Sequence, residues 1–318
     1  MSRAHLHVHL ESAIRWSTLA ELAARNAVSG PSPPSAGFAG LPAFVEHNQL
    51  VRDCLRTPAD FTRIAREFCA DEAADGTGYV EVSFTAAGHG ERLGDLDMPL
   101  LAVLDGLAQG AEEHGIQCRV LLDHSRRRSV ERAWRTLELA RRYADRGVIG
   151  IGLAGDEAFP ATPFAAVCDA ARDTGLLLVH HAGEAAEPAS IREVLDVGHA
   201  ERIGHGIRIL DDPDLVAEVR ERRIPLEVCP SSNVALGFAP SLTEHPIGRL
   251  VEAGLLVTVN TDIPAIVGTT LAAEYAAVRW AIDDDQLTRN GWAAIRKPSA
   301  PTPSRSGPAS SPRPAGSP

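Results

Sequence analysis

The feature that most constrains the fold of this chain is a regular alternation of short apolar runs with longer helical patterns. The runs are rich in Val, Leu and Ile and are typical of β-strands that are buried on both faces. Strands that alternate with helices pair in parallel, because each helix returns the chain to the same edge of the sheet. The sequence has eight such runs, at residues 4–10, 78–84, 116–122, 148–153, 176–181, 201–205, 225–229 and 255–260.

Helical patterns fill the intervals between these runs, and their number decides between two α/β folds. They are found at residues 16–26, 57–75, 98–114, 128–146, 162–174, 187–197, 212–222 and 244–253, with a last pattern at 271–282. This repeat count matches a (β/α)8 barrel of the TIM type, which typically has about 250 residues. A doubly wound sheet is the alternative, but no G-x-G-x-x-G follows the first run. The sequence therefore favours a TIM-type barrel.

Two segments fall outside this regular pattern. The interval between the first two runs, 10–77, is long and contains a stretch rich in Pro, Gly and Ser at 29–42. We interpret it as an inserted helical and loop segment over the barrel mouth, either a lid or a disordered surface loop. The end of the chain is rich in proline and serine, cannot form a core and is expected to be disordered. The predicted organisation is one barrel domain at 1–290 and a tail at 291–318.

Composition excludes several classes of protein. The net charge of −11 argues against a nucleic-acid partner. The sequence has no apolar run of about 18 residues, so no membrane span is expected. No basic segment followed by an apolar one opens the chain, so no signal peptide is predicted. The five cysteines are scattered without a C-x-x-C pair, which favours reduced thiols and a cytoplasmic location.

The first strand-like run contains three alternating histidines, in the sequence Ala4-His5-Leu6-His7-Val8-His9-Leu10. Residues i and i+2 of a strand point to the same face, so His7 and His9 can direct two imidazoles at one point. Neutral imidazole is a good ligand for Zn²⁺. His5 lies one residue pair deeper on the same face and could be a third ligand or a buried partner. For this run alone, a His-rich terminus without a metal is the alternative.

Polar side chains also gather where the later strands end. Barrel enzymes carry their catalytic groups at the carboxyl ends of the strands, so residues at these places are expected to meet. The segments are Gly155-Asp156-Glu157, His180-His181-Ala182-Gly183-Glu184, Gly204-His205-Gly206, Cys229-Pro230-Ser231-Ser232-Asn233 and Asn260-Thr261-Asp262. So many metal-binding and proton-transferring side chains at strand ends predict one metal-centred site.

These residue types suit a hydrolase with one metal ion. A catalytic Zn²⁺ keeps one position open for water and lowers the pKa of that water from ~15.7 towards ~7. His205 could orient this water or take its proton, and Glu184 could donate a proton to the substrate. The candidate ligands are His7, His9, one of His180 and His181, and Asp262.

Two other metal chemistries do not fit the sequence. Zinc deaminases that act on cytosine-type substrates use H-x-E together with P-C-x-x-C, and this chain has no P-C-x-x-C. The only lysine is Lys297, so no carbamylated lysine can bridge two metal ions within the first 296 residues. The chain is therefore expected to hold a single metal ion.

Taken in order, these motifs resemble those of the adenosine deaminase family. The resemblance covers residues 4–282 and implies zinc-dependent hydrolysis of a 6-aminopurine nucleoside, a small-molecule substrate, with release of ammonia. The matching segments are His7-Val8-His9-Leu10-Glu11, Leu153-Ala154-Gly155-Asp156-Glu157, His181-Ala182-Gly183-Glu184, Ile203-Gly204-His205-Gly206, Cys229-Pro230-Ser231-Ser232-Asn233 and Asn260-Thr261-Asp262.

The resemblance also implies a role for each matching residue. It implies that His205 holds and polarises the attacking water and that Glu184 protonates the ring nitrogen next to the attacked carbon. Gly155 is implied to contact the base and Glu11 to face the ribose. The implied ligands of one zinc ion, or of another divalent ion such as Fe²⁺, are His7, His9, His181 and Asp262. Strand alternation turns His180 towards the helices, so we expect it to be structural.

One position departs from the family pattern. The family usually has a second Asp, thought to hold ring nitrogen N7, where this chain has Ile263. A polar edge of the substrate ring that finds no hydrogen-bond partner in a buried pocket costs about 1–3 kcal/mol of binding free energy. The first hypothesis is deamination of adenosine or a 5′-substituted adenosine. The alternatives are deamination of another amino-heterocycle, such as adenine or aminodeoxyfutalosine, and a non-catalytic or unstable truncated member of the family.

Overall fold

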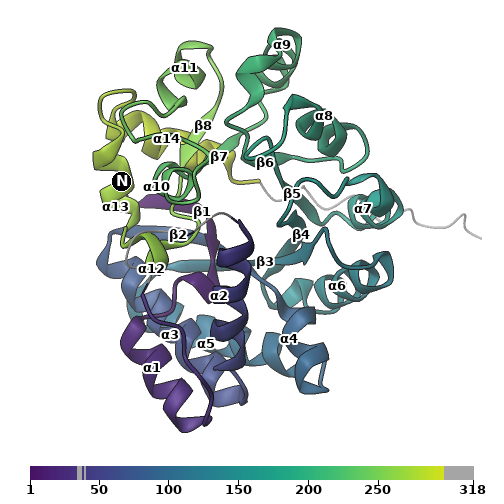
Figure 1. Ribbon diagram of the computed structural model, residues 1–318, viewed down its shortest axis with the longest axis vertical. Coiled ribbons are helices and arrows are strands. Elements are labelled where there is room, and N and C mark those ends of the chain that lie inside the picture. Colours follow the sequence, from purple (N-terminus) through teal and green to yellow (C-terminus); the bar gives the residue numbers. More distant parts are fainter. Residues whose placement is uncertain (34–37, 39–40, 297–318) are drawn as a thin grey trace, which may run out of the picture.

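The computed structural model describes residues 1–33, 38 and 41–296, and its centre is a ring of eight parallel strands (Figure 1). Neighbours in the sequence are neighbours in the sheet, from β1 through β8. The strands are β1 (Arg3–His9), β2 (Thr77–Phe84), β3 (Gln117–Ser125), β4 (Val148–Ala154), β5 (Leu177–Ala182), β6 (Arg202–His205), β7 (Leu226–Val228) and β8 (Val257–Val259). Each of them overlaps a run that the sequence marks as a strand, and β3 extends three residues beyond its run.

The ring is completed by residues that follow β8. The amide of Asp262 donates to the carbonyl of His7 at 3.0 Å, and the amide of His9 donates to the carbonyl of Asp262 at 2.9 Å. The side-chain oxygen of Asn260 accepts from the amide of Leu6 at 2.8 Å. These contacts join the last strand segment to the first one. The predicted (β/α)8 barrel is therefore confirmed.

Helices connect the strands and cover the outside of the barrel. The helix α3 begins at Pro58 behind a capping box formed by Thr57 and Asp60, and α5 ends at Gly115, which adopts a left-handed φ of 69°. The outer helices are α3 (Pro58–Ala74), α4 (Ala86–Leu93), α5 (Met98–His114), α6 (Val130–Arg142), α7 (Ala165–Asp173), α8 (Pro188–Asp196), α9 (Pro213–Arg222), α11 (Ile247–Glu252), α13 (Leu271–Ala277) and α14 (Asp284–Ala294). Two short helices, α10 (Pro230–Ala235) and α12 (Pro264–Val267), follow β7 and β8.

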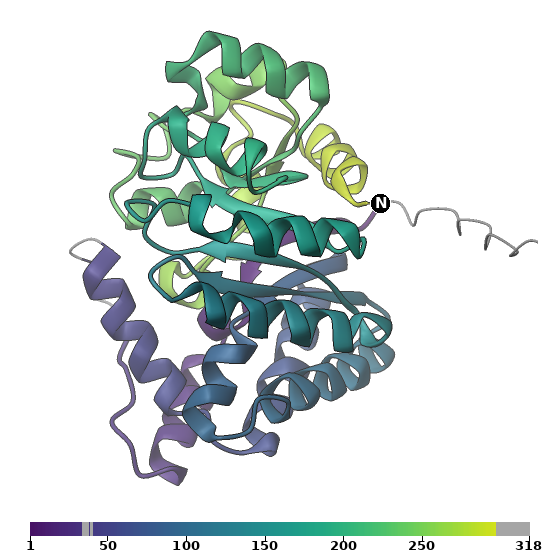
Figure 2. The same cartoon turned by 90° about the vertical axis from the view of Figure 1, so that its right-hand side faces the viewer.

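The long interval after β1 forms two further helices, α1 (Trp16–Arg25) and α2 (Leu41–Asp53). They lie on the side of the barrel opposite the N-terminus (Figure 2). The sequence pattern predicts α1 but not α2, because the apolar residues Phe44 and Val45 of α2 face a pocket instead of the core. The predicted insertion is thus helical over 41–53, while residues 34–37 and 39–40 lie outside the described residues.

The helix α14 attaches the end of the described chain to the barrel. The indole of Trp292 donates to the carbonyl of Ser2 at 2.7 Å, and the side-chain amide of Asn290 donates to the carbonyl of Val257 at 2.7 Å. The helix runs to Ala294, past residue 291, where the tail is predicted to begin. Residues 297–318 lie outside the described residues, so the division into barrel and tail stays a prediction.

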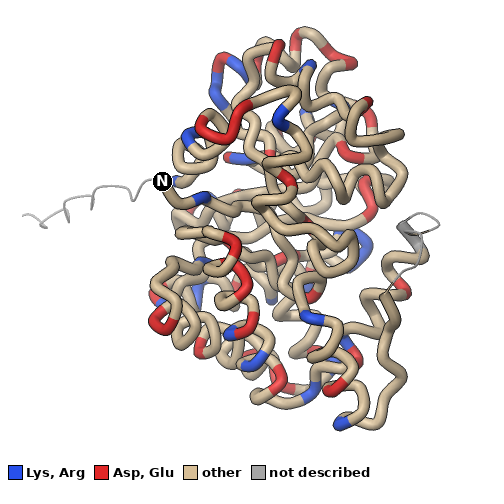
Figure 3. Tube along the Cα trace, turned by 90° about the vertical axis from the view of Figure 1, so that its left-hand side faces the viewer, with Lys and Arg blue, Asp and Glu red and all other residues tan. Residues whose placement is uncertain are grey.

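The outer surface carries charges of both signs. Figure 3 shows acidic and basic residues interspersed along the helices in that view. Exposed ion pairs such as Arg142–Asp97, at 2.8 Å, join neighbouring helices and loops. Among residues 1–33, 38 and 41–296, no helix has the length and apolar character that a bilayer crossing requires.

Candidate active site

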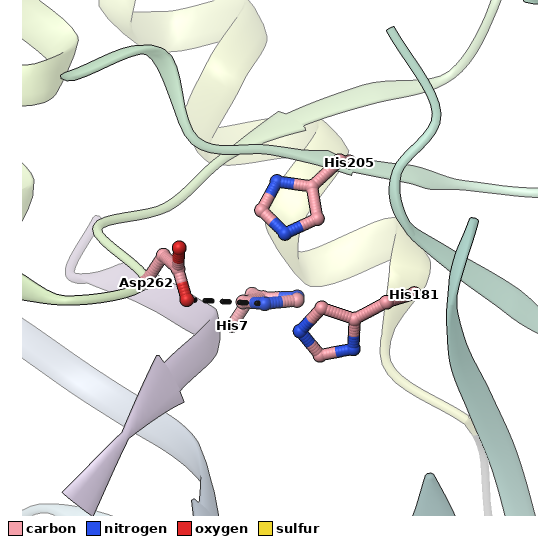
Figure 4. Close-up of side chains that lie close together, drawn as sticks. All are labelled: His7, His181, His205 and Asp262. Atoms are coloured by element: carbon pink, nitrogen blue, oxygen red, sulfur yellow. Dashed lines mark ion pairs between the residues drawn. The ribbon is translucent and has the colours of Figure 1, made fainter. Parts of the chain in front are cut away.

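Three imidazoles and one carboxylate converge at the carboxyl ends of the strands (Figure 4). One possible ligand atom from each of His7, His181, His205 and Asp262 lies within 4.8 Å of the others. His9 adjoins this group, because its Nε2 is 3.2 Å from Nε2 of His181 and 3.2 Å from Oδ1 of Asp262. The structure therefore brings together all four predicted ligands and the predicted water-binding histidine. We call these five residues the His/Asp cluster.

Local backbone geometry directs these side chains inward. His205 ends the short strand β6 and Asp262 follows the short strand β8, and the two residues adopt left-handed φ angles of 64° and 58°. Such angles are uncommon for residues other than glycine and are found where a site fixes the direction of a side chain. The neighbour of His205 is Gly204, and a Cβ atom there would lie 2.8 Å from Cε1 of His7. The glycine therefore leaves the space that the His7 ring occupies.

His7 has the environment of a metal-binding imidazole. Its Nδ1 is 2.9 Å from a carboxylate oxygen of Glu227 on β7. Its Nε2 is buried and has no hydrogen-bond partner among the described residues, since Oδ1 of Asp262 is 3.7 Å away. Burial disfavours the charged ring, but Asp262 and Glu227 outweigh it and raise the pKa of His7 to about 9. A buried nitrogen aimed at a carboxylate and two further imidazoles fits a divalent ion.

His9 is oriented in the same way by a different strand. Its Nδ1 is 2.8 Å from Oδ2 of Asp123 on β3. Burial lowers the pKa of the ring, but the nearby carboxylates Asp123 and Asp262 more than offset this effect and raise the pKa of His9 well above its usual value. Carboxylates that hold the remote nitrogen of a histidine fix its tautomer and leave the other nitrogen free to bind a metal. Glu227 and Asp123 thus give the two histidines of β1 equivalent supports.

A buried chain of charges continues inward from Glu227. Arg202 of β6 donates from Nε to Glu227 at 2.6 Å and also pairs with Glu81 of β2. The hydroxyl of Tyr79 donates to Glu81 at 2.8 Å. All of these side chains are buried inside or beside the barrel. The interior below the His/Asp cluster is therefore filled by a paired charge network in place of an apolar layer.

Two groups suited to acid–base chemistry are in contact here: Glu184, which lies beside the cluster, and His205, which belongs to it. Oε1 of Glu184 accepts a hydrogen bond from the amide of Asn233 at 2.8 Å and lies 3.4 Å from Nδ1 of His205. Burial, together with the nearby carboxylates Asp262 and Glu157, raises the pKa of Glu184 well above its usual value. Burial lowers the pKa of His205 to about 3. These surroundings therefore favour the protonated form of Glu184 and the neutral form of the His205 imidazole.

The turn that carries Glu184 is held by a neighbouring carboxylate. Glu157 accepts from the amides of Gly183 at 2.7 Å, Glu184 at 2.9 Å and Ala185 at 2.9 Å. Gly183 has a φ of 66°, and a Cβ atom there would lie 2.4 Å from the side chain of Ile191. These contacts fix the backbone from which the Glu184 side chain extends towards the cluster.

A pocket of about 310 Å³ opens from the His/Asp cluster, close to the smallest volume typical of small-molecule sites. Gly155 and Ile263 lie on its wall, and α2 supplies part of the opposite side. Glu11 also lines it and accepts from the amide of Thr85 at 3.2 Å, with Nε2 of His89 also 3.2 Å away. Burial alone would raise the pKa of Glu11, but the hydrogen bond and charge of His89 and the charge of Arg52 outweigh this effect and lower the pKa to about 2. Both predicted substrate-binding residues therefore face the same pocket as the cluster.

Comparison with known proteins places this chain in a family. Its sequence matches the adenosine deaminase family over residues 2–306. The chain belongs to the adenosine deaminase family. Relatives include a putative adenosine/adenine deaminase of Streptomyces virginiae, 36% identical over 313 residues, with 95% of this chain and 92% of the relative covered.

Solved structures of adenosine deaminase relatives have the same fold. An adenine deaminase from Arthrobacter aurescens superposes with a TM-score of 0.86 at 29% identity, covering 93% of this chain and 94% of that one. An Arabidopsis protein named ADAL, solved with IMP, gives a TM-score of 0.81 at 27% identity, with 92% of each chain covered. Membership in the adenosine deaminase family makes this chain an enzyme, a hydrolytic deaminase.

Two further histidines of this adenosine deaminase relative have structural partners. His5 contacts Glu72 through Nδ1 at 3.0 Å and the hydroxyl of Thr261 through Nε2 at 3.0 Å, so it is a buried partner and lies outside the cluster. Nδ1 of His180 accepts from the amide of Leu153 at 3.0 Å, and its Nε2 donates to the carbonyl of Gly198 at 2.9 Å. The expectation that His180 is structural agrees with these contacts.

Sequence reasoning assigned no role to three residues that contact the site, although it placed Asn233 in a motif at a strand end. Asp123 and Glu227 orient the two histidines of β1, and Asn233 holds both Glu184 and His205. A usable signal was present for the two acids, because Glu227 lies between the buried residues Leu226 and Val228 and Asp123 directly follows the buried apolar residues 120–122. An ionised side chain in such a strand requires a partner, and the centre of the barrel is where one is found.

Proposed function

We propose that this chain is a zinc-dependent aminohydrolase that replaces the 6-amino group of a purine with oxygen and releases ammonia. The observation that carries the proposal is the His/Asp cluster, with the unpaired Nε2 of His7 aimed into it and Glu184, whose buried surroundings favour its protonated form, beside it. Nitrogen and carboxylate donors in this number suit zinc, and another divalent ion such as Fe²⁺ has the same preference. We propose His7, His9, His181 and Asp262 as the ligands of a single ion.

The remaining residues supply binding and proton transfer. A bound zinc ion would lower the pKa of water so that hydroxide forms near neutral pH. His205, neutral and held by Asn233, would orient the water for attack on the carbon that bears the amino group. Glu184 would donate its proton to the adjacent ring nitrogen, and ammonia would leave after a further proton transfer. Each of these groups lies within the pocket that the substrate must enter.

The substrate proposal is adenosine, or an adenosine carrying a modification or a 5′ substituent, with Gly155 against the base and Glu11 towards the ribose. The names of the relatives support a substrate of the adenosine or adenine type. Ile263 is buried on the pocket wall and supports a second candidate, an amino-heterocycle with an apolar edge at that position. The cytoplasmic location and the independence from nucleic acid and membranes stay predictions.

A substrate screen on metal-loaded protein tests the proposal. Adenine, adenosine and other amino-heterocycles would be followed by the change in ultraviolet absorbance and by ammonia release. We expect turnover that a chelator removes and zinc restores, with about one ion bound per chain. Glu184→Gln should keep the metal content and lose at least a hundredfold in kcat, because general acid catalysis contributes about 10²–10⁴-fold. Normal turnover by this variant would show that Glu184 is not the acid.

A further inference from the structure

Two cysteines from different elements place their sulfur atoms side by side between the barrel and its outer helices. Sγ of Cys69, on α3, lies 3.4 Å from Sγ of Cys118, on β3, although the two residues are 49 positions apart in the chain. Both are free thiols in this structure. A disulfide bond has an S–S length of about 2.05 Å, so the two sulfurs have to approach by about 1.4 Å to form one.

The packing of α3 on α5 fixes the position of Cys69. A Cβ atom at Gly110 of α5 would lie 2.6 Å from Cβ of Cys69, so the glycine leaves the room that this side chain occupies. Sγ of Cys69 also lies 3.7 Å from the carbonyl oxygen of Leu107 on the same helix. Cys69 is fully buried. Its sulfur is therefore held beside Cys118 and shielded from solvent.

Cys118 differs from Cys69 because it can be reached from outside. It is partly exposed and lines a cavity of about 540 Å³ between α5, β3 and the turn before β4. The cavity gives its side chain space to rotate and gives a small oxidant access to its sulfur. The hydrogen bond with Cys118, together with burial, raises the pKa of the Cys69 thiol and disfavours Cys69 as the sulfur that reacts first.

We propose that Cys69 and Cys118 form an intramolecular disulfide when the protein meets hydrogen peroxide, and that this bond clamps α3 to β3. The Cys118 thiolate attacks one peroxide oxygen and the O–O bond breaks. The departing hydroxide takes up the proton that the thiol lost, so one water leaves and Cys118 becomes a sulfenic acid. The Cys69 sulfur then attacks the Cys118 sulfur, the S–O bond breaks, and the oxygen leaves with the Cys69 proton as a second water. The two thiols lose two electrons, and the peroxide gains them.

The position of the bond indicates its effect. It would close the chain between Cys69 and Cys118 into a loop, which restricts the unfolded chain more than the folded one. Cys118 lies near the amino end of β3, whereas the His/Asp cluster lies at the carboxyl ends of the strands. We therefore expect the linked protein to melt at a temperature about 5 °C or more higher than the reduced protein, with its metal content unchanged.

Peptide mapping of the oxidised full chain tests the bond directly. Zinc-loaded protein would be treated with hydrogen peroxide, alkylated, digested without a reductant and analysed by mass spectrometry. We expect a pair of peptides linked through Cys69 and Cys118, which dithiothreitol separates. Cys54→Ala is the matched control, because Cys54 is also a buried thiol but its sulfur contacts the carbonyl of Leu50. This variant should form the same link as the wild type.

Two variants separate the roles of the two sulfurs. Cys69→Ala removes the sulfur that completes the bond, so Cys118 should stop at the sulfenic acid, and its labelling by dimedone should rise about tenfold or more over the wild type. Cys118→Ser removes the accessible sulfur, so Cys69 should stay a thiol in peroxide. Cys118 is partly exposed and serine has a similar shape, so this variant avoids a folding defect.

Three results would overturn the proposal. The first is a wild type in which Cys118 is labelled by dimedone without a link to Cys69. The second is a disulfide between the Cys118 residues of two chains, seen as a dimer on a non-reducing gel. The third is a linked protein that melts at the same temperature as the reduced protein or below it. Linkage and melting are measured without a substrate, so these outcomes are independent of the deaminase activity.

Discussion

The charge network inside the barrel leads to a quantitative prediction about stability. Arg202 is fully buried between Glu81 and Glu227, with its Nε 2.6 Å from a Glu227 oxygen. The substitution Arg202→Met keeps a side chain of similar length and removes the only cation that contacts both carboxylates among the described residues. Removal of one partner from a buried ion pair costs about 3–5 kcal/mol, because it leaves an uncompensated charge. Glu227 keeps its contact with His7 and Glu81 keeps the hydrogen bond from Tyr79, but both carboxylates lose their guanidinium partner, so we expect a loss within that range.

Urea unfolding of the metal-loaded protein, followed by circular dichroism, measures this loss. Arg142→Met is the matched control, since Arg142 forms an exposed ion pair with Asp97 and should cost about 0–1 kcal/mol. The double variant Arg202→Met/Glu81→Gln removes one of the unpaired charges and should regain about 1–3 kcal/mol relative to Arg202→Met. Equal costs for Arg202→Met and Arg142→Met, or a double variant less stable than Arg202→Met, would refute the reasoning.

Three further predictions concern the site. Asp123→Asn should weaken zinc binding by about 10–100-fold, because it loses the carboxylate that orients His9, and a competition assay with a metal-binding dye would detect this. Ile263→Asp should raise kcat/KM for adenosine by about tenfold or more relative to Ile263→Val; an unchanged or lower value would favour the other amino-heterocycles. The pKa of Glu11 is about 2 in the fold, below its usual 4.5, so its contribution to stability is complete above 4.5 and is lost as the pH falls from 4.5 towards 2. Melting temperatures should therefore fall more steeply with acid in the wild type than in Glu11→Gln, and parallel curves would contradict this.

The barrel could be predicted from the sequence because each strand is a separate apolar run and each connection has helical periodicity. Two helices, α2 and α4, were harder to predict. α2 presents Phe44 and Val45 to the pocket, so its pattern does not have the apolar face that packs on a core. α4 has only eight residues and two glycines, Gly88 and Gly90, which weaken any helical signal. A hydrophobic pattern does not predict a helix such as α2, whose apolar residues face a cavity instead of the core.

The ligands of the site could be predicted for a different reason. Histidine and aspartate at strand ends meet in any parallel barrel, so their convergence follows from topology alone. The contacts of Glu227 with His7 and of Asp123 with His9 depend on the register and tilt of strands that are far apart in the sequence. A single sequence contains no record of that register.

The seam of the barrel and the His/Asp cluster share residues. The backbone of Asp262 is hydrogen-bonded to the backbones of His7 and His9, while the side chains of the same three residues face one another across the site. Any loosening of the junction between β1 and β8 would therefore displace three donors at once. Conversely, an ion bound by those three side chains would link β1 to the segment after β8 and stabilise the closure of the sheet. Metal content should then report on the integrity of the whole ring, and depletion of the ion should first become apparent as fraying at this junction.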